Sequence, residues 1–478
     1  MSERIQCLLI HVPDTTNNIC HLIPIGMFGI ADYLTQNKVV TKIIHVGIEK
    51  MCNKFFNIAN FIRSQQIKIV CFDLHWHYQS WAVINCIKEI KKYAPCVKVI
   101  IGGYTASFFA MEIMRKFREV DFVVRGDAEV PLLKLIRAIL NNNTPSNIPN
   151  ILWRNKGRII VNKQSYTIGV RQLNKILYSR FDLLKNYKLY IKPSFFYRIT
   201  KVSLPFFYSP GRGCTVNCSF CGGSRVSQLI INKRKCVIMK SVKSALKDIE
   251  NSKKYGINSL YMCFDPFVNR KHYIQLFKQI RKSGIKFKMF FECWSLPTKE
   301  FIDSFKETFE KGSQIILSPE TGSDHIRKKN KGFFFSNKDF FSVMDYLALK
   351  KLDVILFFST GLPFEKKENF LETINFFKRI KARYKNVRFC CSPIRMEPCS
   401  PYYLNEKKYC VKSKRKTFMD FYNASKNKVT IGYRTKYFSE KQIEANYILM
   451  EKLFKRKVLL NKIPFRIISL VSKIIEKS

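Results

Sequence analysis

Gly211 to Ser224 reads G-R-G-C-T-V-N-C-S-F-C-G-G-S and places three cysteines, Cys214, Cys218 and Cys221, in the spacing C-x3-C-x2-C. Three thiolates this close in sequence can hold one face of an iron–sulfur cluster. A structural zinc site needs four ligands, and four cysteines around a cluster would leave no iron open. The spacing therefore favours a cluster with one open iron. Incidental buried thiols, and zinc with a distant fourth cysteine, are the alternatives.

Glycines flank the three cysteines on both sides. Gly211 and Gly213 precede the first cysteine, and Gly222 and Gly223 follow the last one. Because glycine has no Cβ, it lets the backbone turn tightly and lets a ligand approach closely. The glycines predict a compact loop around a cluster, with space for a ligand at the open iron.

A regular alternation of strand-like and helix-like runs surrounds this loop. The two patterns follow one another six times in residues 201–395. A closed eightfold barrel typically takes about 250 residues, so about 190 residues predict an open, partial (β/α)6 barrel. The expected strands are 204–208, 259–264, 287–291, 314–317, 354–359 and 387–391, and the expected helices are 240–254, 272–283, 298–311, 338–350 and 367–383.

Residues 1–142 contain a second alternation. Short β-rich runs separated by helical patterns of about 10–15 residues imply βαβ units and a parallel sheet. The pattern predicts an α/β, doubly wound, flavodoxin-like domain, whose ligands bind at the carboxyl ends of its strands. A linker with a hairpin is expected in 143–200, and a basic, mostly helical segment in 396–478. The expected strands of the first domain are 5–12, 39–46, 67–72, 97–101 and 121–124.

The amino-acid composition bears on the net charge of the protein and on its cellular compartment. The 478 residues carry a formal net charge of +49, from 84 Lys and Arg against 35 Asp and Glu, and include 16 Cys. Lysines are spread over the whole length, which favours a biased composition with a solvated surface; a nucleic acid or an anionic membrane is the alternative partner. No signal peptide and no apolar run of ~20 residues is evident. We expect a cytoplasmic protein, whose clustered cysteines bind metal because thiols stay reduced there.

The cysteine loop and its barrel resemble the radical S-adenosylmethionine superfamily, whose mark is a C-x3-C-x2-C loop after the first strand of a partial (β/α)6 barrel. The resemblance implies a [4Fe–4S] cluster held by Cys214, Cys218 and Cys221, whose fourth iron binds S-adenosylmethionine. Reductive cleavage of that molecule, with an electron from an external donor of flavodoxin or ferredoxin type, would yield a 5′-deoxyadenosyl radical. Phe220 matches the aromatic residue usual before the last cysteine.

Two further stretches extend this resemblance to the S-adenosylmethionine site. In S-P-E-T-G-S-D, residues 318–324, Glu320 is the implied partner of the ribose hydroxyls. In G-L-P-F-E, residues 361–365, Gly361 and Glu365 belong to a loop that resembles the one at the adenine and methionine end. Gly222 and Gly223 are implied contacts of the same molecule.

The stretch Y-M-C-F-D-P, residues 261–266, departs from the superfamily pattern, because it lacks the Gly-Gly-Glu-like motif expected after the second strand. Asp265 is instead a candidate to face the substrate. For each of these strand-end carboxylates, capping of the following helix is the structural alternative.

The first domain resembles the cobalamin-binding domain that precedes the barrel in one radical S-adenosylmethionine subgroup. The resemblance implies that Gly102, Gly103 and Gly126 let the backbone approach a corrin ring. The matching pieces, all at expected strand ends or turns, are 24–34, 73–80, 101–107 and 124–129.

One departure concerns the lower face of cobalt. The D-x-H-x-x-G motif of other cobalamin domains is absent after the first strand, where H-V-P-D-T-T-N stands at residues 11–17. The resemblance places His75, Trp76 and His77 beneath the corrin. Packing or hydrogen bonding is the favoured role of His75. Ligation of cobalt is the alternative, because imidazole is a good transition-metal ligand.

The resemblance implies an enzyme that methylates an unactivated carbon of a small molecule or natural product through the adenosyl radical and methylcobalamin. A rearrangement or ring contraction with the same cofactors is the nearest alternative. A tRNA methylthiotransferase, suggested by the charge of +49, and a non-enzymatic binding protein are less favoured, so nucleic acid is not the expected partner.

Residues 454–477 show apolar residues at helical spacing among basic ones. Packing on the barrel is favoured there, and peripheral membrane contact is the alternative.

Overall fold

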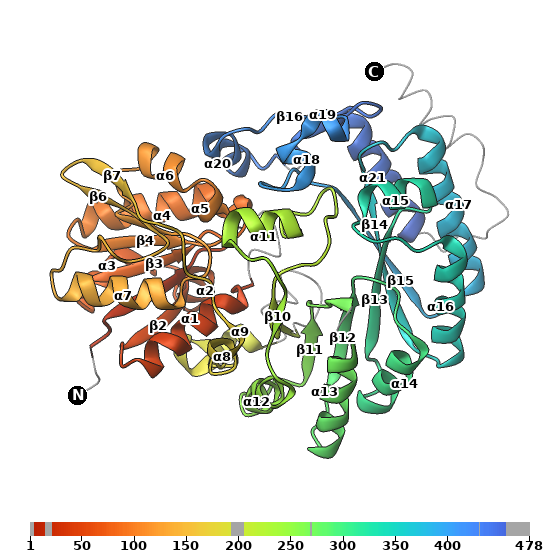
Figure 1. Cartoon of the computed structure of the whole chain (residues 1–478), viewed down its shortest axis with the longest axis horizontal. Coiled ribbons are helices and arrows are strands. Elements are labelled where there is room, and N and C mark those ends of the chain that lie inside the picture. Colours follow the sequence, from red (N-terminus) through yellow and green to blue (C-terminus); the bar gives the residue numbers. More distant parts are fainter. Residues whose placement is uncertain (1–3, 15–21, 193–204, 268–269, 430, 456–478) are drawn as a thin grey trace. The chain divides into compact units, whose positions relative to one another are not determined.

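The computed structural model describes residues 4–14, 22–192, 205–267, 270–429 and 431–455 (Figure 1). The chain divides into two compact units. The first comprises residues 1–213, 227–259 and 416–429, and the second comprises residues 214–226, 260–415 and 430–478. The prediction for residues 454–477 therefore falls almost wholly outside the described residues. Within the described residues, no helix is both long and apolar enough to cross a membrane.

The first unit is built on a seven-stranded sheet in the order β2-β1-β3-β4-β5-β6-β7. The strands β1 to β5 are parallel, and their order 2-1-3-4-5 is that of flavodoxin-like folds. The predicted doubly wound domain is thus confirmed. The strands are β1 Cys7–His11, β2 Thr41–His45, β3 Ile69–Asp73, β4 Lys98–Gly102, β5 Phe122–Val124, β6 Ile151–Asn155 and β7 Arg158–Val161.

The predicted hairpin extends this sheet. β6 pairs antiparallel with β5 and with β7, and the turn between β6 and β7 is the pair Lys156-Gly157. Both turn residues have positive φ, 44° and 80°, which is the conformation that two-residue hairpin turns favour. The sheet therefore continues beyond the five strands expected for residues 1–142.

Helices cover both faces of the first sheet (Figure 1). α1 packs beside α7, and α3 packs beside α4. Their burial follows amphipathic patterns; in α4, for example, Val83, Ile84, Ile87 and Ile90 are buried. The helices are α1 Ile25–Gln36, α2 Val46–Cys52, α3 Ile58–Ser64, η2 His77–Gln79, α4 Ser80–Tyr93, α5 Tyr104–Phe108, α6 Ala110–Lys116 and α7 Glu129–Leu140.

A helix from far along the chain completes the first unit. α20, Phe418–Lys426, packs on α4 and η2. The ring of Phe421 lies 4.9 Å from that of His77 and 5.5 Å from that of Phe109. The backbone N–H of Phe418 donates to Glu112 at 2.6 Å. Part of the basic C-terminal segment therefore folds with the N-terminal sheet.

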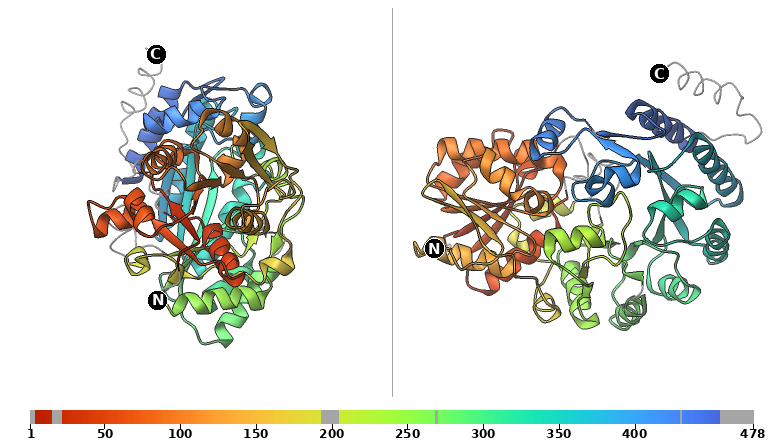
Figure 2. Two further views of the ribbon diagram at one scale, coloured as in Figure 1. Left: turned by 90° about the vertical axis from the view of Figure 1, so that its left-hand side faces the viewer. Right: turned by 45° about the horizontal axis from the view of Figure 1, so that its top comes forward.

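The second sheet has six strands in the order β15-β14-β13-β12-β11-β8, and β12 to β15 are parallel neighbours. The predicted open (β/α)6 arrangement is confirmed. The helices α13, α14, α16 and α17 lie along one face of this sheet (Figures 1 and 2); the opposite face is called the inner face below. The strands are β8 Phe206–Tyr208, β11 Ser259–Met262, β12 Lys288–Cys293, β13 Gln314–Glu320, β14 Asp353–Thr360 and β15 Val387–Pro393.

Most expected helices of the barrel occur near their predicted bounds. They are α12 Val242–Lys253, α13 Arg270–Lys282, α14 Lys299–Thr308, α16 Asn337–Leu349 and α17 Lys367–Arg383. Two short helices were not predicted, α11 Arg225–Asn232 and α15 Asp324–Asn330. A small antiparallel pair brackets the cysteines in sequence, since β9 Gly211–Arg212 comes immediately before them and β10 Ile238–Met239 follows α11.

The described part of the C-terminal segment combines helices with one pair of short strands. It contains α18 Pro401–Leu404, α19 Glu406–Tyr409, α20 and α21 Glu440–Lys455. Between them, β16 Val411–Ser413 and β17 Tyr433–Thr435 form an antiparallel pair. α21 packs on β14 and β15, where Phe454 contacts Phe377 and Phe389 with ring centroids 4.9 and 5.4 Å away.

Candidate functional site

The three cysteines lie on a loop without regular secondary structure, and backbone N–H groups point at two of their sulfurs. The N–H of Gly223 points at the sulfur of Cys221 at 3.3 Å, and the N–H of Gly332 points at the sulfur of Cys218 at 3.4 Å. The sulfur of Cys214 lies 3.6 Å from the carbonyl oxygen of Val216. N–H groups directed at sulfur tune the reduction potential of iron–sulfur clusters.

Burial raises the pKa of each of the three thiols. The pKa of Cys221 rises to about 12, and the nearby sulfurs of Cys218 and Cys214 add to this rise. The pKa values of Cys214 and Cys218 are raised as well. Buried, mutually repelling thiolates are stable only beside a compensating positive charge, which a bound metal centre supplies.

Across the part of the chain that the structure describes, no three His, Cys, Asp or Glu side chains converge on the position of a single metal ion. In a cubane cluster each cysteine binds a different iron, so three cysteine ligands need not share one ion position.

Asn330, at the end of α15, fixes the cysteine loop in place. Its backbone oxygen accepts the N–H of Ser219 at 2.7 Å, and its side-chain oxygen pairs with the Ser219 hydroxyl at 2.6 Å. Its amide nitrogen donates to the carbonyl of Pro363 at 2.8 Å. Asn330 is 1% exposed. One buried side chain thus joins the cysteine loop to the G-L-P-F-E stretch.

Gly332 belongs to the same support. A Cβ at this position would lie 2.4 Å from the backbone nitrogen of Asn217, a distance that no real side chain tolerates. Only glycine lets the segment after α15 lie against the cysteine loop. The sequence reasoning did not single out Asn330 or Gly332.

Glu320 ends β13 in a strained conformation. Its φ is +64°, and the pairing of β13 with β14 shifts register between Leu317 and Glu320. A non-glycine residue in the left-handed region costs free energy and is often found at functional sites. The Glu320 carboxylate accepts a hydrogen bond from the Ser359 hydroxyl, and Lys331 lies 3.4 Å from its other oxygen. Glu320 is therefore oriented by two neighbours.

Arg327 organises the loop that follows Glu320. This guanidinium is fully buried and donates to the carbonyl oxygens of Pro319, Thr321 and Phe335. It also donates to Asp324 at 2.5 Å. The stretch 318–324 thus holds its shape through a single buried cation, which sequence reasoning missed because R-K-K-N-K reads as a solvated charge run.

Gly361 and Glu365 lie in the loop after β14. Gly361 has a φ of +81°, and its carbonyl oxygen accepts the Tyr433 hydroxyl at 2.6 Å. Glu365 is 0% exposed, and neither carboxylate oxygen forms a hydrogen bond with the described residues. Burial raises its pKa to about 8, although the nearby N–H groups of Gly361 and Leu362 lower it. Glu365 is thus a buried acid without a cation partner.

Gly222 and Gly223 differ in their surroundings. A Cβ on Gly222 would lie 3.1 Å from the carbonyl oxygen of Pro398 and 3.2 Å from Cβ of Glu397, so this glycine packs against the turn after β15. A Cβ on Gly223 would meet only the sulfur of Cys221, at 3.8 Å, within 4 Å. Gly223 therefore offers the more open backbone.

Asp265 does not face a substrate. It is fully buried, pairs with Arg270 at 2.6 Å and accepts the backbone N–H of Trp294 at 2.9 Å. Arg270 in turn donates to the carbonyl oxygens of Ser295 and Leu296. Its role differs from the expected helix cap as well, because Asp265 neutralises Arg270 and ties the ends of β11 and β12 together.

The candidate cobalamin residues lie at the carboxyl ends of β3, β4 and β5. The ring of His75 lies 4.9 Å from that of Trp76 and 5.2 Å from that of Tyr104. A Cβ on Gly103 would lie 2.8 Å from the carbonyl carbon of Leu74, so internal packing by itself requires this glycine.

Gly126 and Gly102 also differ in how much space surrounds them. A Cβ on Gly126 would meet Gln164 at 3.0 Å and the Ile231 carbonyl at 3.2 Å, whereas Gly102 has only the Val124 carbonyl oxygen nearby, at 3.5 Å. Gly102 thus leaves the most room for a ligand.

The stretch V-R-G-D-A-E after β5 ends in a buried ionic cluster. Asp127 pairs with Arg212 at 2.8 Å and also with Arg234. Glu129 pairs with Arg212 at 2.5 Å, and its second oxygen has no hydrogen-bond partner among the described residues. These acids therefore hold the strand before Gly213, and no sequence pattern indicates their partners.

A second buried polar group at the strand ends was also missed. His11, the last residue of β1, contacts both carboxylate oxygens of Asp73 at 3.0 Å. Its ring lies 4.9 Å from that of His45, which accepts the N–H of Ile48 and caps α2. The only sequence signal is a polar residue at the end of each apolar run.

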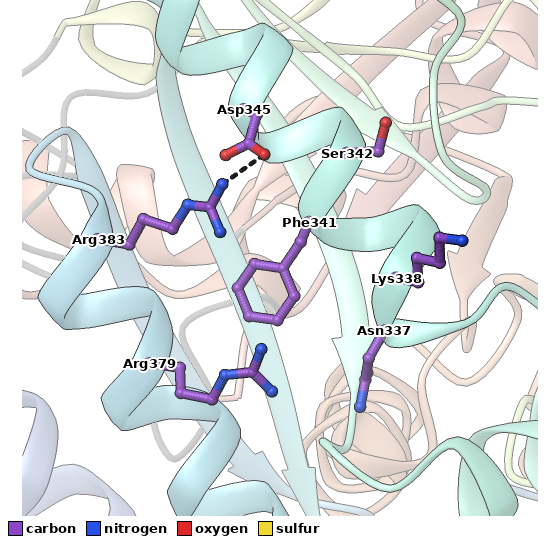
Figure 3. Close-up of a pocket in the computed structure, with 7 residues that line it drawn as sticks. All are labelled: Asn337, Lys338, Phe341, Ser342, Asp345, Arg379 and Arg383. Carbon is purple, nitrogen blue, oxygen red and sulfur yellow. Dashed lines mark hydrogen bonds and ion pairs between the residues drawn. The ribbon is translucent and has the colours of Figure 1, made fainter.

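A pocket of about 500 Å³ lies on the outer side of the second unit, between α16 and α17 (Figure 3). In it, Arg383 pairs with Asp345 at 2.6 Å, and the guanidinium of Arg379 lies 4.6 Å from the ring centre of Phe341. None of the predicted site residues lines this pocket.

Family comparison separates the two sheets into known domains. The model of the B12-binding domain matches residues 20–136, and that of the radical SAM superfamily matches residues 208–377. One chain therefore carries a B12-binding domain followed by a radical SAM domain. Its cofactors are accordingly cobalamin, a [4Fe–4S] cluster and S-adenosylmethionine.

Individual relatives of this radical S-adenosylmethionine protein are distant. An uncharacterised methyltransferase of Pyrococcus horikoshii is 23% identical over 402 residues, which cover 80% of each chain. The anaerobic magnesium-protoporphyrin IX monomethyl ester cyclase of Synechocystis is 26% identical over 133 residues, covering 28% of this chain and 24% of that one.

A solved structure shares the fold. The radical S-adenosylmethionine methyltransferase TsrM of Kitasatospora setae, with cobalamin and a [4Fe–4S] cluster bound, matches with a TM-score of 0.68 at 14% identity, covering 92% of this chain and 84% of that one. A second structure of TsrM, with tryptophan substrate and a S-adenosylmethionine analogue, gives a TM-score of 0.69 and covers 93% and 89%.

The buried acid Glu365 predicts a stability that depends on pH. Its pKa is 4.5 ordinarily and about 8 in the folded chain, so between these values the folded state holds the extra proton. The free energy of unfolding therefore falls as pH rises through this window, by up to about 1.4 kcal/mol per pH unit. Glu365→Gln removes this slope, so the variant should gain stability over the wild type from pH 5 to pH 8 in urea denaturation. Exposed Glu368→Gln is the matched control, and a Glu365→Gln curve parallel to the wild type contradicts the prediction.

Proposed function

We propose that the chain is a cobalamin-dependent radical S-adenosylmethionine enzyme that transfers a methyl group to an unactivated carbon of a small molecule. The observation that carries this proposal is the presence, in one chain, of a B12-binding domain and a three-cysteine barrel loop. The Pyrococcus relative named as a methyltransferase supports it, since the match covers 80% of both chains. TsrM, whose structure holds tryptophan as substrate, supports the choice of a small molecule.

Cys214, Cys218 and Cys221 are the proposed ligands of the cluster. The donor set fits, because three partly buried soft thiols lie on one loop and N–H groups point at two of them. When bound, the cluster, S-adenosylmethionine and cobalamin would together supply the radical and the methyl group. The chain's own part is to hold these groups in position and to exclude water.

The proposed contacts of S-adenosylmethionine are Glu320, Gly361, Glu365, Gly222 and Gly223. Glu320 is the best supported, since Lys331 and Ser359 orient its carboxylate and its backbone is strained. Gly223 is supported by its open backbone, whereas Gly222 and Gly361 act through the packing of their loops. Glu365, buried and without a cation, shapes the loop after β14.

For cobalamin, the proposed contacts are His75, Trp76, Gly102, Gly103 and Gly126. The aromatic contacts of His75 with Trp76 and Tyr104 support a packing role beneath the ring rather than ligation of cobalt. Gly102 is the proposed point of close backbone approach, and Gly103 and Gly126 shape the strand ends.

The remaining proposals concern domains and surroundings. We propose residues 1–142 as the cobalamin-binding domain, 143–200 as a linker with a hairpin, 201–395 as the radical domain and 396–478 as the C-terminal segment. An external flavodoxin or ferredoxin supplies the electron, and the cytoplasm is the proposed location, because the cluster needs reducing conditions.

A rearrangement or ring contraction without methyl transfer is the second candidate function. The match to the anaerobic cyclase of Synechocystis favours it, although that match covers only 28% of this chain. Both candidates use the same cofactors, so the products must distinguish them.

The first test concerns the cluster. Anaerobically reconstituted protein should bind about four irons and four sulfides and absorb broadly near 400 nm, as such clusters do. Replacing Cys214, Cys218 and Cys221 together by Ala should abolish the absorbance and the formation of 5′-deoxyadenosine. Cys236→Ala, which changes an exposed cysteine, is the control. A cluster retained in the triple variant would exclude these ligands.

The second test counts products. Methyl transfer consumes two S-adenosylmethionine molecules per turnover and yields 5′-deoxyadenosine and S-adenosylhomocysteine in equal amounts. With S-adenosylmethionine carrying a labelled methyl group, the label should appear in the product together with both nucleosides. Turnover that yields 5′-deoxyadenosine without S-adenosylhomocysteine would favour the rearrangement.

The third test concerns His75. Cobalamin bound to the full chain and reduced to its Co(II) form should show no nitrogen superhyperfine splitting in its electron paramagnetic resonance spectrum, because His75 packs rather than ligates. His75→Ala should leave the spectrum unchanged and weaken cobalamin binding. Splitting that disappears in this variant would instead establish ligation.

A further inference from the structure

A glutamate on the inner face of the second sheet belongs to none of the sites described above. In β12 the exposed fraction alternates along the strand, so that Met289, Phe291 and Cys293 are buried while Phe290 and Glu292 are partly exposed. Phe291 contacts Phe301 of α14, with ring centroids 4.9 Å apart. Since successive side chains of a strand point to opposite faces, Glu292 faces away from the helices, on the inner face.

Tyr261 on the neighbouring strand β11 shares this face. Its hydroxyl donates to one carboxylate oxygen of Glu292 at 3.1 Å. Leu260 and Met262 on either side of Tyr261 are buried on the opposite face. The two polar groups therefore form a pair across adjacent strands.

The Glu292 carboxylate is only partly satisfied. Among the described residues, its second oxygen accepts no hydrogen bond and no Lys, Arg or His lies within ion-pair distance. Lys331, the cation whose charge reaches it, is bonded to Ser318 and Glu320. Burial raises the pKa of Glu292 to about 7, and the charge of Glu320 adds to this rise. A half-buried carboxylate without a cation gains most from a ligand that brings one.

Two aromatic side chains share the inner face with this carboxylate. Phe290 precedes it by two residues, and Phe357 of β14 lies on the same face, because its neighbour Phe358 contacts Phe376 of α17 on the helical face. The face of an aromatic ring attracts an ammonium group electrostatically, and it has no such attraction for a neutral group. The carboxylate and the aromatic rings together favour a ligand that has a positive group attached to an apolar group.

Pairing along the sheet puts this group near the proposed S-adenosylmethionine site. Glu292 is aligned with Ile316 of β13, four residues before Glu320. Across the register shift, Ile316 pairs with Ile355 and Glu320 with Phe358, three residues apart on β14. At about 3.3 Å per residue, the backbone positions of Glu292 and Glu320 are therefore roughly 10 Å apart along the strand direction. A molecule bound at Glu292 would thus lie beside the nucleoside site.

We propose that Glu292, supported by Tyr261, binds an ammonium group on the inner face of the barrel sheet. This inference rests on the proposed function, because it names the substrate class of that same site as a small amine with an apolar body. The same chemistry exists in the methionine moiety of S-adenosylmethionine, so the experiment must distinguish the two sources.

The experiment compares three probes on the reconstituted full chain by ligand-observed NMR and equilibrium dialysis. 2-Phenylethylamine presents the ammonium group, 2-phenylethanol is its neutral analogue, and S-adenosylmethionine is the third probe. Glu292→Gln keeps the size of the side chain and its bond to Tyr261 but removes the charge. Glu307→Gln, on the exposed surface, is the charge-matched control, and Glu292→Asp tests rescue by a shorter acid.

If the substrate carries the ammonium group, Glu292→Gln should weaken 2-phenylethylamine binding at least tenfold and leave the other two probes within twofold. If S-adenosylmethionine carries it, Glu292→Gln should instead weaken S-adenosylmethionine binding tenfold. In either case Glu292→Asp should restore part of the loss, and Glu307→Gln should bind like the wild type. Equal affinities in wild type and Glu292→Gln for both ammonium probes, or an equal loss for the alcohol, would overturn the proposal.

The outcome is separable from that of the proposed function. Thermal unfolding of each variant shows whether it folds, and the 400 nm absorbance shows whether it holds a cluster. Wild-type protein that fails to cleave S-adenosylmethionine contradicts the radical function, whatever the amine binding. Protein that cleaves it normally but binds the amine independently of Glu292 contradicts only the ammonium site.

Discussion

The arrangement of the proposed cluster site depends on the buried side chain of Asn330. The cysteine loop is rich in glycine and polar residues, so apolar burial cannot fix its shape. Asn330 substitutes hydrogen bonds for this burial, since it holds Ser219 by two bonds and Pro363 by a third. Each of these groups is buried, and losing one partner would leave the others unsatisfied, at about 1–3 kcal/mol each. Loops that follow different strands are thereby held in one arrangement before any cofactor binds.

Asn330 belongs to a short segment that shows why sequence reasoning predicted the strands better than their connections. The strands of both sheets were predicted because parallel strands buried on both faces appear as continuous apolar runs. Residues 327–332 instead read R-K-K-N-K-G, which resembles a solvated charge run. In the structure Arg327 is 0% and Asn330 1% exposed, and the buried guanidinium binds three carbonyl oxygens. Composition cannot separate a buried cation from a solvated one, because the difference lies in carbonyl groups contributed by other loops.

The glycines illustrate the same limit at the candidate cobalamin site. Sequence position alone suggested that Gly102, Gly103 and Gly126 all make room for a ligand. Geometry separates them, since a Cβ on Gly103 would collide with the backbone of Leu74, whereas a Cβ on Gly102 would meet only the Val124 carbonyl oxygen, at 3.5 Å. The motif cysteines could be assigned from spacing because their chemistry is local. The supporting residues could not, because Arg212, Asn330 and Gly332 act on partners distant in the sequence.

Three glutamates lie on consecutive strands or in the loops after them, and their different neighbours give them different properties. Glu320 has a cation and a hydroxyl as partners, so its orientation is fixed. Glu365 is fully buried with neither, and burial raises its pKa to about 8. Glu292 lies between these cases, with one phenol as its partner and one oxygen left for a ligand. In a chain with a net charge of +49, cations abound on the surface, yet none pairs with Glu292 among the described residues. Because a half-buried carboxylate without a cation gains most from a positive group brought by a ligand, Glu292 is the acid of the three that is open to such a partner.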